Sequence, residues 1–311
     1  MLLKSADNKT KDLETLESLL RHPGAAARTH QLIEREIRNI RAGMKGEAEV
    51  AYELDFHFKS RNWLVIHDLR IEHDGRVAQI DHVLLNRFLH MYVCESKRFS
   101  EGVAINEQGE FAAFFNHKPY GVPSPIEQNK RHIIVLEDLF RNNVIQLPRR
   151  LGLTLKPTLE SFVLVSKSAR ISRPKSPVPG LENVLKSDQF VSRIDLDLKS
   201  DSPLSMAKLI GQDTLEDLGR QLVALHSPIS VNWAAKFGLE SASPARAEDS
   251  AAPVQTPSAA GADADSGETK KGSKLVCSGC GVPVSYAVAK FCWSNRRFGG
   301  NVCCMACQKN H

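Results

Sequence analysis

The sequence predicts an α/β domain joined by a flexible tether to a small cysteine-rich module. Three observations support this fold class. Apolar residues recur at helical spacing through residues 11–59 and then, from Asn62, take the two-residue period of strands. Residues 241–274 are rich in Ala, Ser, Pro, Gly and Asp and hold almost no large apolar side chain, so they cannot bury enough surface to fold alone. Six of the seven cysteines follow this tether.

The composition excludes several classes of protein. With 311 residues, 42% of them hydrophobic and 25% charged, the chain resembles a soluble globular protein rather than a collagen or a wholly disordered chain. No segment approaches the roughly 18 uninterrupted apolar residues of a membrane span. The N-terminal stretch lacks the apolar core of a secretory signal. We therefore expect a cytoplasmic protein with no membrane partner, and the net charge of +5 permits a polyanionic one.

The first domain is expected to begin with helices and to continue as a sheet. A leucine stripe predicts a helix from residue 11 that is broken at Pro23 and Gly24, and Gly43 and Gly46 are expected to separate two further helices. These two helices are expected at 25–42 and 47–59, and a later helix at 125–143. Strands are expected within 62–71, 76–85, 90–97 and 159–167, and a further hairpin is expected to turn at Gly109. The expected domain ranges are N-terminal helices at 1–39, a central domain at 40–167, its helical or irregular extension at 168–240, the tether at 241–274 and the cysteine module at 275–311.

Charged residues interrupt two of the apolar strands. Asp81 lies inside RVAQIDHVLL, and Glu95 and Lys97 lie two residues apart in HMYVCESK. Because strand side chains alternate, Glu95 and Lys97 project from one face. If the two strands form a hairpin across residues 86–90, Asp81 comes opposite Glu95.

This combination of side chains fits a divalent metal site. Two neighbouring carboxylates raise each other's pKa unless a cation joins them, and Mg²⁺ prefers such hard oxygen ligands. A lysine beside the metal can orient or deprotonate a water molecule or stabilise charge on a phosphate. Glu47, at the start of the third expected helix, can add a carboxylate directly or through water.

The segments GEAEVAYEL, QIDHVLL, YVCESK, Gly102 and SPIEQNKRHI, in this order, resemble the NERD (nuclease-related) domain. That family is similar to the PD-(D/E)xK nucleases, so the resemblance implies a restriction-endonuclease-like mixed sheet flanked by helices. It also implies Mg²⁺ or Mn²⁺ as cofactor, Asp81 and Glu95 as metal ligands, and Lys97 as the catalytic lysine. It further implies Glu47 as the helix carboxylate and Gln128 as the helix glutamine. The family usually has a glycine-containing turn between the Asp and Glu strands, whereas this chain has NRFLH, which leaves the hairpin register open.

Taken alone, these residues also have simpler structural interpretations. An Asp in a strand often serves as a turn or capping partner, and a Glu-x-Lys pair is usually a solvated ion pair worth under about 1 kcal/mol. His82 faces away from Asp81 and is expected in packing or in support of the site, whereas His117 and His132 are expected at the surface. Cys94 is expected to be a buried apolar residue rather than a nucleophile.

The C-terminal cysteines have the spacing of a zinc site. Cys277 and Cys280 form one C-x2-C pair and Cys304 and Cys307 another, which predicts tetrahedral Zn²⁺ binding that supplies most of the module's folding energy. From spacing alone, Cys292 or Cys303 can replace one of the four ligands. The segment also resembles the C4 zinc ribbon that follows NERD domains and is similar to topoisomerase zinc fingers. That resemblance favours 277, 280, 304 and 307 as the ligands.

Basic and aromatic residues lie between the two cysteine pairs. Arg296, Arg297 and Phe298 form a pattern that suits phosphate contact and base stacking, although zinc ribbons also bind proteins.

Together, these features predict a Mg²⁺-dependent nuclease that hydrolyses phosphodiester bonds, with DNA as the expected substrate and the zinc ribbon as its binding module. Two alternatives belong to other classes. In one, the same fold binds nucleic acid without cutting it. In the other, the ribbon docks a helicase or another DNA-processing protein.

Overall fold

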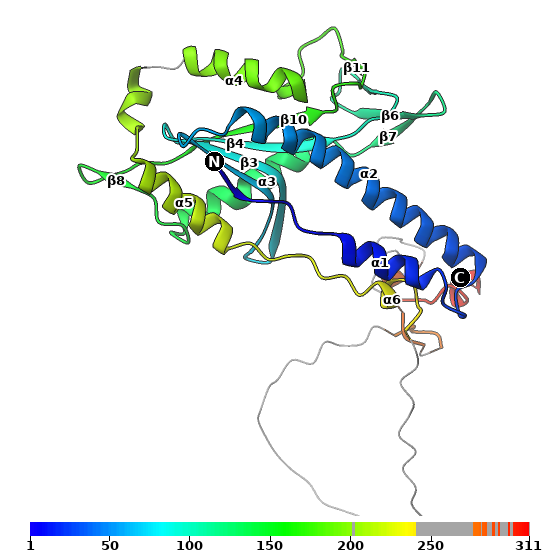
Figure 1. The fold of residues 1–311 in the computed structure, drawn as a ribbon. Helices are drawn as coiled ribbons and strands as arrows, with labels where there is room; N and C mark the ends of the chain where they lie inside the picture. The colour runs from blue at the N-terminus through cyan, green and yellow to red at the C-terminus, as the bar shows by residue number, and fades with distance from the viewer. Residues whose placement is uncertain are drawn as a thin grey trace, which may run out of the picture. The chain divides into compact units, whose positions relative to one another are not determined.

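The computed structural model describes residues 1–200, 203–240, 276–280, 282–284, 288–289, 292, 298 and 301–310. The chain divides into two compact units, Met1–Pro244 and Ala245–His311 (Figure 1). The tether expected at 241–274 and the basic pair Arg296 and Arg297 lie outside the described residues.

A six-stranded mixed sheet is the centre of the first unit (Figure 1), with the strand order β1-β2-β3-β4-β10-β12. The pairs β2–β3 and β3–β4 are antiparallel and the other three pairs are parallel. The strands are β1 (Leu2–Lys4), β2 (Trp63–His73), β3 (Arg76–Asn86), β4 (His90–Lys97), β10 (Thr158–Val165) and β12 (Val184–Lys186). The four expected strands are thus present, and a strand from each flank of the central domain extends the same sheet.

The β3–β4 turn forms without a glycine. The side-chain oxygen of Asn86 accepts hydrogen bonds from the backbone N–H groups of Phe88 and His90, both at 3.0 Å. Leu89 takes a left-handed conformation, with φ of 60°, and its side chain is fully buried. Burial of an apolar side chain, worth roughly 1.5–3 kcal/mol, offsets the cost of this conformation. The hairpin therefore forms across residues 86–90 as expected.

Helices cover both faces of the sheet. On one face, α2 (Ala27–His57) and α4 (Phe190–Lys199) pack on a core that includes Leu54, Tyr92, Phe162 and Phe190. On the other face, α3 (Pro125–Arg141) and α5 (Gln212–Ala224) pack on a second core that includes Ile66, Val93 and Leu136. Ser124 caps α3 by accepting a hydrogen bond from the backbone N–H of Glu127. This helix–sheet–helix arrangement is the α/β class that the strand and helix periodicities predicted.

The expected break at Gly43 and Gly46 is wrong, because α2 runs without interruption from Ala27 to His57. Both glycines keep helical geometry. Gly46 is buried, and a Cβ atom there would lie 3.0 Å from the Cβ of Arg98. This glycine therefore permits close approach between α2 and the chain that follows β4, instead of ending the helix.

Smaller elements flank the main sheet. A four-stranded sheet has the order β11-β5-β6-β7, and Gly109, with φ of 78°, lies in the expected β5–β6 turn. The strands outside the main sheet are β5 (Val103–Ile105), β6 (Phe111–Phe115), β7 (Lys118–Val122), β8 (Arg149–Arg150), β9 (Leu153–Thr154) and β11 (Ile171–Ser172). Short 3-10 helices occupy Leu181–Asn183, Ser187–Gln189, Pro203–Lys208 and Cys307–Asn310.

The two ends of the first unit meet on the N-terminal half of α2. α1 (Thr10–Leu19) and α6 (Trp233–Lys236) share a small core with this half, in which Leu16, Ile33 and Trp233 are buried. Figure 1 shows α1 and α6 beside this end of α2. Among the described residues, no helix combines the length and apolar character needed to cross a bilayer.

Gly102 provides a test of this packing. It has φ of 113°, and a Cβ there would lie 2.6 Å from the carbonyl oxygen of Arg170, which accepts a hydrogen bond from Val103. Gly102→Ala is expected to lower the free energy of unfolding by about 2–4 kcal/mol through strain and overlap. The control Gly75→Ala, at φ of 70° with open space around it, should cost only about 1 kcal/mol. Denaturant unfolding measures both values, and equal losses would contradict the overlap.

Candidate functional site

A cavity of about 370 Å³ lies where β3 and β4 meet α2 and α3. All five residues expected to form the catalytic site line this cavity, together with Gln79, Ser96, Arg98 and His132. The expected residues are Glu47, Asp81, Glu95, Lys97 and Gln128. The tertiary structure therefore brings together side chains from four separate elements.

Glu95 lies at the centre of the polar contacts in this cavity. Its side chain is only 2% exposed, and its Oε1 accepts hydrogen bonds from Lys97 Nζ and, at 2.8 Å, from Gln128 Nε2. The expectation that Glu95 and Lys97 share a strand face is thus confirmed. The other oxygen, Oε2, is buried and accepts no hydrogen bond from the described residues. One carboxylate oxygen of Glu95 therefore lacks a hydrogen-bond partner among the described residues.

Asp81 lies at an interruption in the β2–β3 pairing. The ladder pairs His67 with His82 and Leu69 with Ile80, and it omits the intervening Asp68–Asp81 position. Asp68 has a left-handed conformation, with φ of 52°. The Asp81 carboxylate accepts a hydrogen bond of 2.7 Å from the backbone N–H of Ser96, which holds it beside Glu95 in β4.

The two carboxyl groups are in an unfavourable environment for negative charge. Burial raises the pKa of Asp81 well above its ordinary value, and the charges of Glu95 and Glu47 raise it further. Burial also raises the pKa of Glu95, while Lys97 acts in the opposite direction. A divalent cation would relieve both the desolvation and the repulsion, so the donor set fits such an ion.

Glu47 faces the same cavity but is directed toward a different cation. Lys9 Nζ lies 3.4 Å from Glu47 Oε2, an interaction that helps to raise the pKa of Lys9 against the effect of burial. Among the described residues, the one group of side chains close enough together to hold a metal ion consists of four cysteines. Glu47 therefore does not form such a group with Asp81 and Glu95. Its charge nevertheless reaches both carboxyl groups, as their raised pKa values show.

The surface position expected for His132 is wrong. His132 is buried, its Nδ1 lies 3.9 Å from Glu95 Oε2, and burial with the nearby charges of Arg131 and Lys97 lowers its pKa to about 4. His132 follows Gln128 by four residues on α3, so both project from one helix face. That spacing was the signal that sequence analysis missed.

His82 belongs to a buried chain of hydrogen bonds behind the site. Asp55 Oδ1 accepts from His67 Nε2 at 3.2 Å, the two histidine Nδ1 atoms lie 2.7 Å apart, and His82 Nε2 lies 2.6 Å from Ser96 Oγ. Burial lowers the pKa of both histidines, so each is neutral at pH 7. The carboxylate then sets the direction of the chain: His82 donates to His67, and Ser96 donates to His82. These hydrogen bonds hold Ser96, the residue between Glu95 and Lys97, from the opposite face of the sheet.

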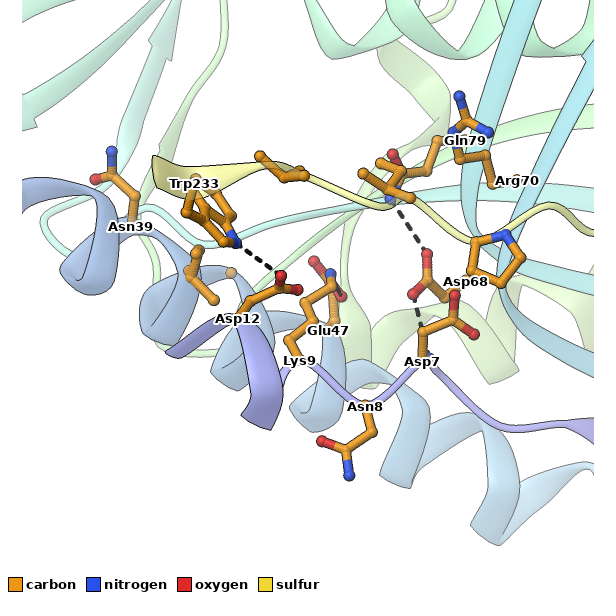
Figure 2. Close-up of a pocket in the computed structure, with 15 residues that line it drawn as sticks. Asp7, Asn8, Lys9, Asp12, Asn39, Glu47, Asp68, Arg70, Gln79 and Trp233 are labelled. Atoms are coloured by element: carbon orange, nitrogen blue, oxygen red, sulfur yellow. Dashed lines mark hydrogen bonds and ion pairs between the residues drawn. The ribbon is translucent and has the colours of Figure 1, made fainter. Parts of the chain in front are cut away.

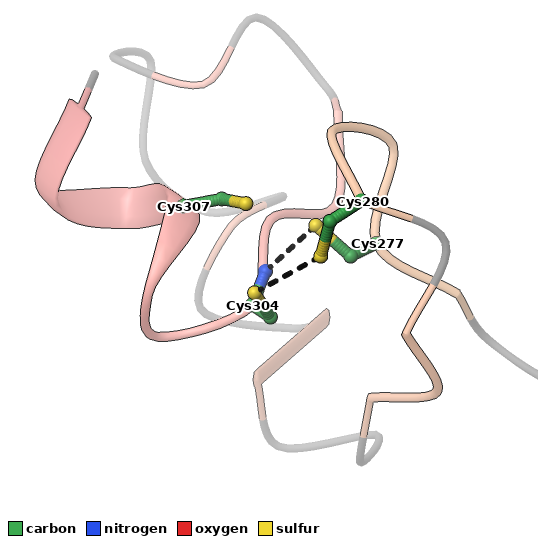
Figure 3. Close-up of side chains that lie close together, drawn as sticks. All are labelled: Cys277, Cys280, Cys304 and Cys307. Carbon is green, nitrogen blue, oxygen red and sulfur yellow. Dashed lines mark hydrogen bonds between the residues drawn. The ribbon is translucent and has the colours of Figure 1, made fainter.

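The second unit contains a compact group of four thiols (Figure 3). The Sγ atoms of Cys277, Cys280, Cys304 and Cys307 all lie within 4.8 Å of one another. The backbone N–H of Cys304 donates to Cys277 Sγ at 3.1 Å, and Cys280 Sγ lies 3.5 Å from Cys304 Sγ. Four cysteine sulfurs so placed form the donor set of a tetrahedral zinc site, and they are the ligands that the resemblance favoured.

The protonation of these thiols also suits a cation. The hydrogen bond from Cys304 lowers the pKa of Cys277 to about 6. Hydrogen bonds with Cys280 and the other thiols raise the pKa of Cys307 to about 12. Without a cation the group therefore retains protons, which a metal ion displaces when it binds.

Cys292 and Cys303 lie outside the four-thiol group. Both are buried with Phe298 in the small core of the module, and Cys292 Sγ accepts hydrogen bonds from Cys303 N and Gln308 Nε2, each at 3.3 Å. Phe298 is 5% exposed, so the expectation of a base-stacking ring does not match its buried position. This ring helps to fill the small core of the module.

Taken together, an α/β sheet with buried carboxylates, a lysine and a helix glutamine in one cavity defines a restriction-endonuclease-like domain. Residues 42–165 match the nuclease-related domain (NERD) family. No curated protein and no solved structure gave a match. The family match begins within α2 and ends with β10, whereas β1 and β12 complete the same sheet from outside it.

The raised pKa of Asp81 predicts a stability cost at neutral pH. Because the pKa of Asp81 is higher in the folded chain than in the unfolded chain, its contribution to the free energy of unfolding is fully present below pH 3.8, the ordinary pKa value. That contribution is lost as the pH rises and the carboxyl group ionises. In metal-free buffer, Asp81→Asn should therefore raise the free energy of unfolding at pH 7 by about 0.5–2 kcal/mol, with the gain vanishing near pH 4. Mg²⁺ should stabilise the unchanged protein but not this variant.

Thermal unfolding with and without Mg²⁺ measures these effects. The control is Asp74→Asn, at an exposed turn position, which should change neither stability nor the response to Mg²⁺. An Asp81→Asn protein that is less stable at pH 7 without metal would contradict the assigned environment.

The four-thiol group predicts a metal stoichiometry. The purified chain should contain one Zn²⁺, and Cys304→Ser should remove it because three thiolates and a hydroxyl bind zinc far more weakly. Cys292→Ala should retain the metal. Elemental analysis with a thiol titration measures both, and zinc lost equally from the two variants would exclude this ligand set.

Proposed function

We propose that the chain is a Mg²⁺-dependent nuclease that hydrolyses phosphodiester bonds in DNA. The observation that carries this proposal is the unsatisfied, buried Oε2 of Glu95 in a cavity shared with Asp81 and Lys97. A buried carboxylate oxygen without a hydrogen bond is costly, and a bound cation supplies the missing partner. The NERD match over residues 42–165 supports a nuclease-related role.

Asp81 and Glu95 would hold the metal, and Mn²⁺ suits the same oxygen donors. When bound, the ion lowers the pKa of a water molecule and neutralises charge that develops on the phosphate. Two protein carboxylates leave room for waters and substrate phosphate, as Mg²⁺ usually requires. Glu47 can act through such a water, since Lys9 already neutralises part of its charge.

The remaining residues orient the two carboxylates and the water molecule that attacks the phosphate. Lys97 is 31% exposed, so its ammonium can contact both Glu95 and a water molecule or phosphate in the cavity. Gln128 fixes Glu95 Oε1, and the Ser96 N–H fixes Asp81. His132 is neutral at pH 7, given its pKa of about 4, and therefore adds no positive charge that competes with a cation.

The zinc module would contribute substrate affinity. Tethering a second nucleic-acid contact to the catalytic unit raises the local substrate concentration. Arg296 and Arg297 are the proposed phosphate contacts, and a helicase or other DNA-processing protein is the proposed alternative partner for this module. The proposed setting is the cytoplasm.

Lys97→Ala tests the reaction. Cleavage of single- and double-stranded DNA in the presence of Mg²⁺ should fall by about 100- to 10,000-fold, the range for loss of a positioned acid–base group. DNA binding, measured by fluorescence anisotropy, should fall by less than about tenfold. RNA substrates of the same sequence serve to measure the preference for DNA.

The control is Lys208→Ala. Lys208 contacts Thr158, which pairs with His90 at the opposite end of β4 from Lys97, so its loss should leave cleavage unchanged. Equal trace cleavage by the unchanged protein, Lys97→Ala and Asp81→Asn would indicate a contaminant. In that case, retained DNA binding would favour a non-catalytic binding module.

A further inference from the structure

A second cavity, of about 590 Å³, adjoins the catalytic one (Figure 2). The two share Gly43, Glu47 and Gln79 in their walls. Much of the second cavity comes from residues outside the NERD match, in the ranges 7–12 and 228–233. The two ends of the first unit thus build a space next to the proposed metal site.

One wall of this second cavity is apolar. It includes Ile40, Ile229, Val231 and the indole of Trp233. Trp233 is held in place because its Nε1–H donates to Asp12 Oδ1 at 2.7 Å, as Figure 2 shows. Ile229 remains 49% exposed at the edge. A flat apolar ligand could therefore cover surface that water now contacts.

The polar side of the cavity is rich in acceptors. Asp68 is buried, and its two oxygens accept from the backbone N–H of Asp7 and from Gln79 Nε2, both at 3.2 Å (Figure 2). Four carboxylates line the cavity, those of Asp7, Asp12, Glu47 and Asp68. Only two cationic side chains line it, those of Lys9 and Arg70. These oxygen acceptors favour a ligand that presents N–H donors.

We propose that this second cavity holds the nucleobase of the nucleotide next to the scissile phosphate. It prefers bases with an exocyclic amino group, namely adenine, cytosine and guanine, over thymine. The proposal rests on the proposed nuclease function, and it assigns base selection to residues outside the family match. The base lies against the Ile229 and Trp233 wall with its amino edge toward the carboxylates, while its phosphate remains beside Lys97.

The volume and the position agree with this occupant. Small-molecule sites typically span about 300–1,000 Å³ and combine apolar walls with a few polar groups. The shared Glu47 and Gln79 make the two cavities neighbours, so one nucleotide can place its phosphate in the first cavity and its base in the second.

Binding can be measured without catalysis. Deoxyadenosine, deoxycytidine and thymidine are titrated into the full chain in EDTA, and the Trp233 indole N–H is followed by ¹H–¹⁵N NMR, with its signal assigned from Trp233→Phe. The two amino-bearing nucleosides should shift this signal and bind about 2- to 10-fold more tightly than thymidine, the ratio that one hydrogen bond contributes. Unshifted indole signals, or equal affinity for thymidine, would overturn the proposal.

Matched variants locate the site. Ile229→Asp should weaken nucleoside binding by about tenfold or more, because its carboxylate must be desolvated against the base. Ile134→Asp on α3 changes a side chain of nearly equal exposure, 48%, that lines neither cavity, and it should leave binding unchanged. Equal weakening by both variants would overturn the assignment.

Cleavage assays separate this proposal from the nuclease proposal. An oligonucleotide in which a single adenine precedes or follows the cut site should lose cleavage when that base is replaced by an abasic site, and Ile229→Asp should remove this dependence. Cleavage that ignores the neighbouring base would overturn the base cavity while leaving the nuclease intact. Nucleoside binding without any cleavage would overturn the nuclease proposal and the position of the base beside a scissile phosphate, and would leave only a nucleoside-binding cavity.

Discussion

The burial of two like charges against one sheet is the constraint on which the rest of the site depends. Asp81 and Glu95 lie in a cavity where burial raises the pKa of both carboxyl groups. Each remaining polar contact reduces that penalty without removing it: Lys97 and Gln128 donate to one oxygen of Glu95, and the Ser96 N–H donates to Asp81. A site that remains short of positive charge is suited to bind a cation, at a cost in stability when the cation is absent.

The interruption of the β2–β3 ladder connects this site with the chain termini. Because Asp68 is left-handed and the Asp68–Asp81 pair is omitted, backbone carbonyls near the kink need other partners. Lys4 provides them, since its Nζ donates to the carbonyls of His67 and Asp68 at 3.1 and 2.9 Å. The N-terminal strand therefore stabilises the backbone at this interruption, where Asp81 lines the first cavity and Asp68 the adjoining one.

Local patterns were enough to predict most elements and five of the residues that line the first cavity. The shared face of Glu95 and Lys97 and the two C-x2-C pairs follow from strand alternation and from ligand spacing. The sequence leaves open the hairpin register that brings Asp81 beside Glu95, and the β3–β4 pairing settles it. The errors have physical causes. Gly46 was expected to break a helix, but it serves close packing against Arg98, a contact with a residue 52 positions away in the sequence. The four-residue spacing between Gln128 and His132, which places both on one face of α3, favours a position for His132 beside the site.

By itself, the sequence determined which residues form the candidate site and the secondary structure in which most of them lie, because alternation and helical periodicity act over a few residues. Only the tertiary structure decided that Glu95 keeps an unsatisfied oxygen, that His67 and His82 support Ser96 from behind, and that residues 7–12 meet residues 228–233 beside the site. These features depend on contacts between segments far apart in the chain. Such contacts are selected by the packing of the whole core, which no short pattern encodes.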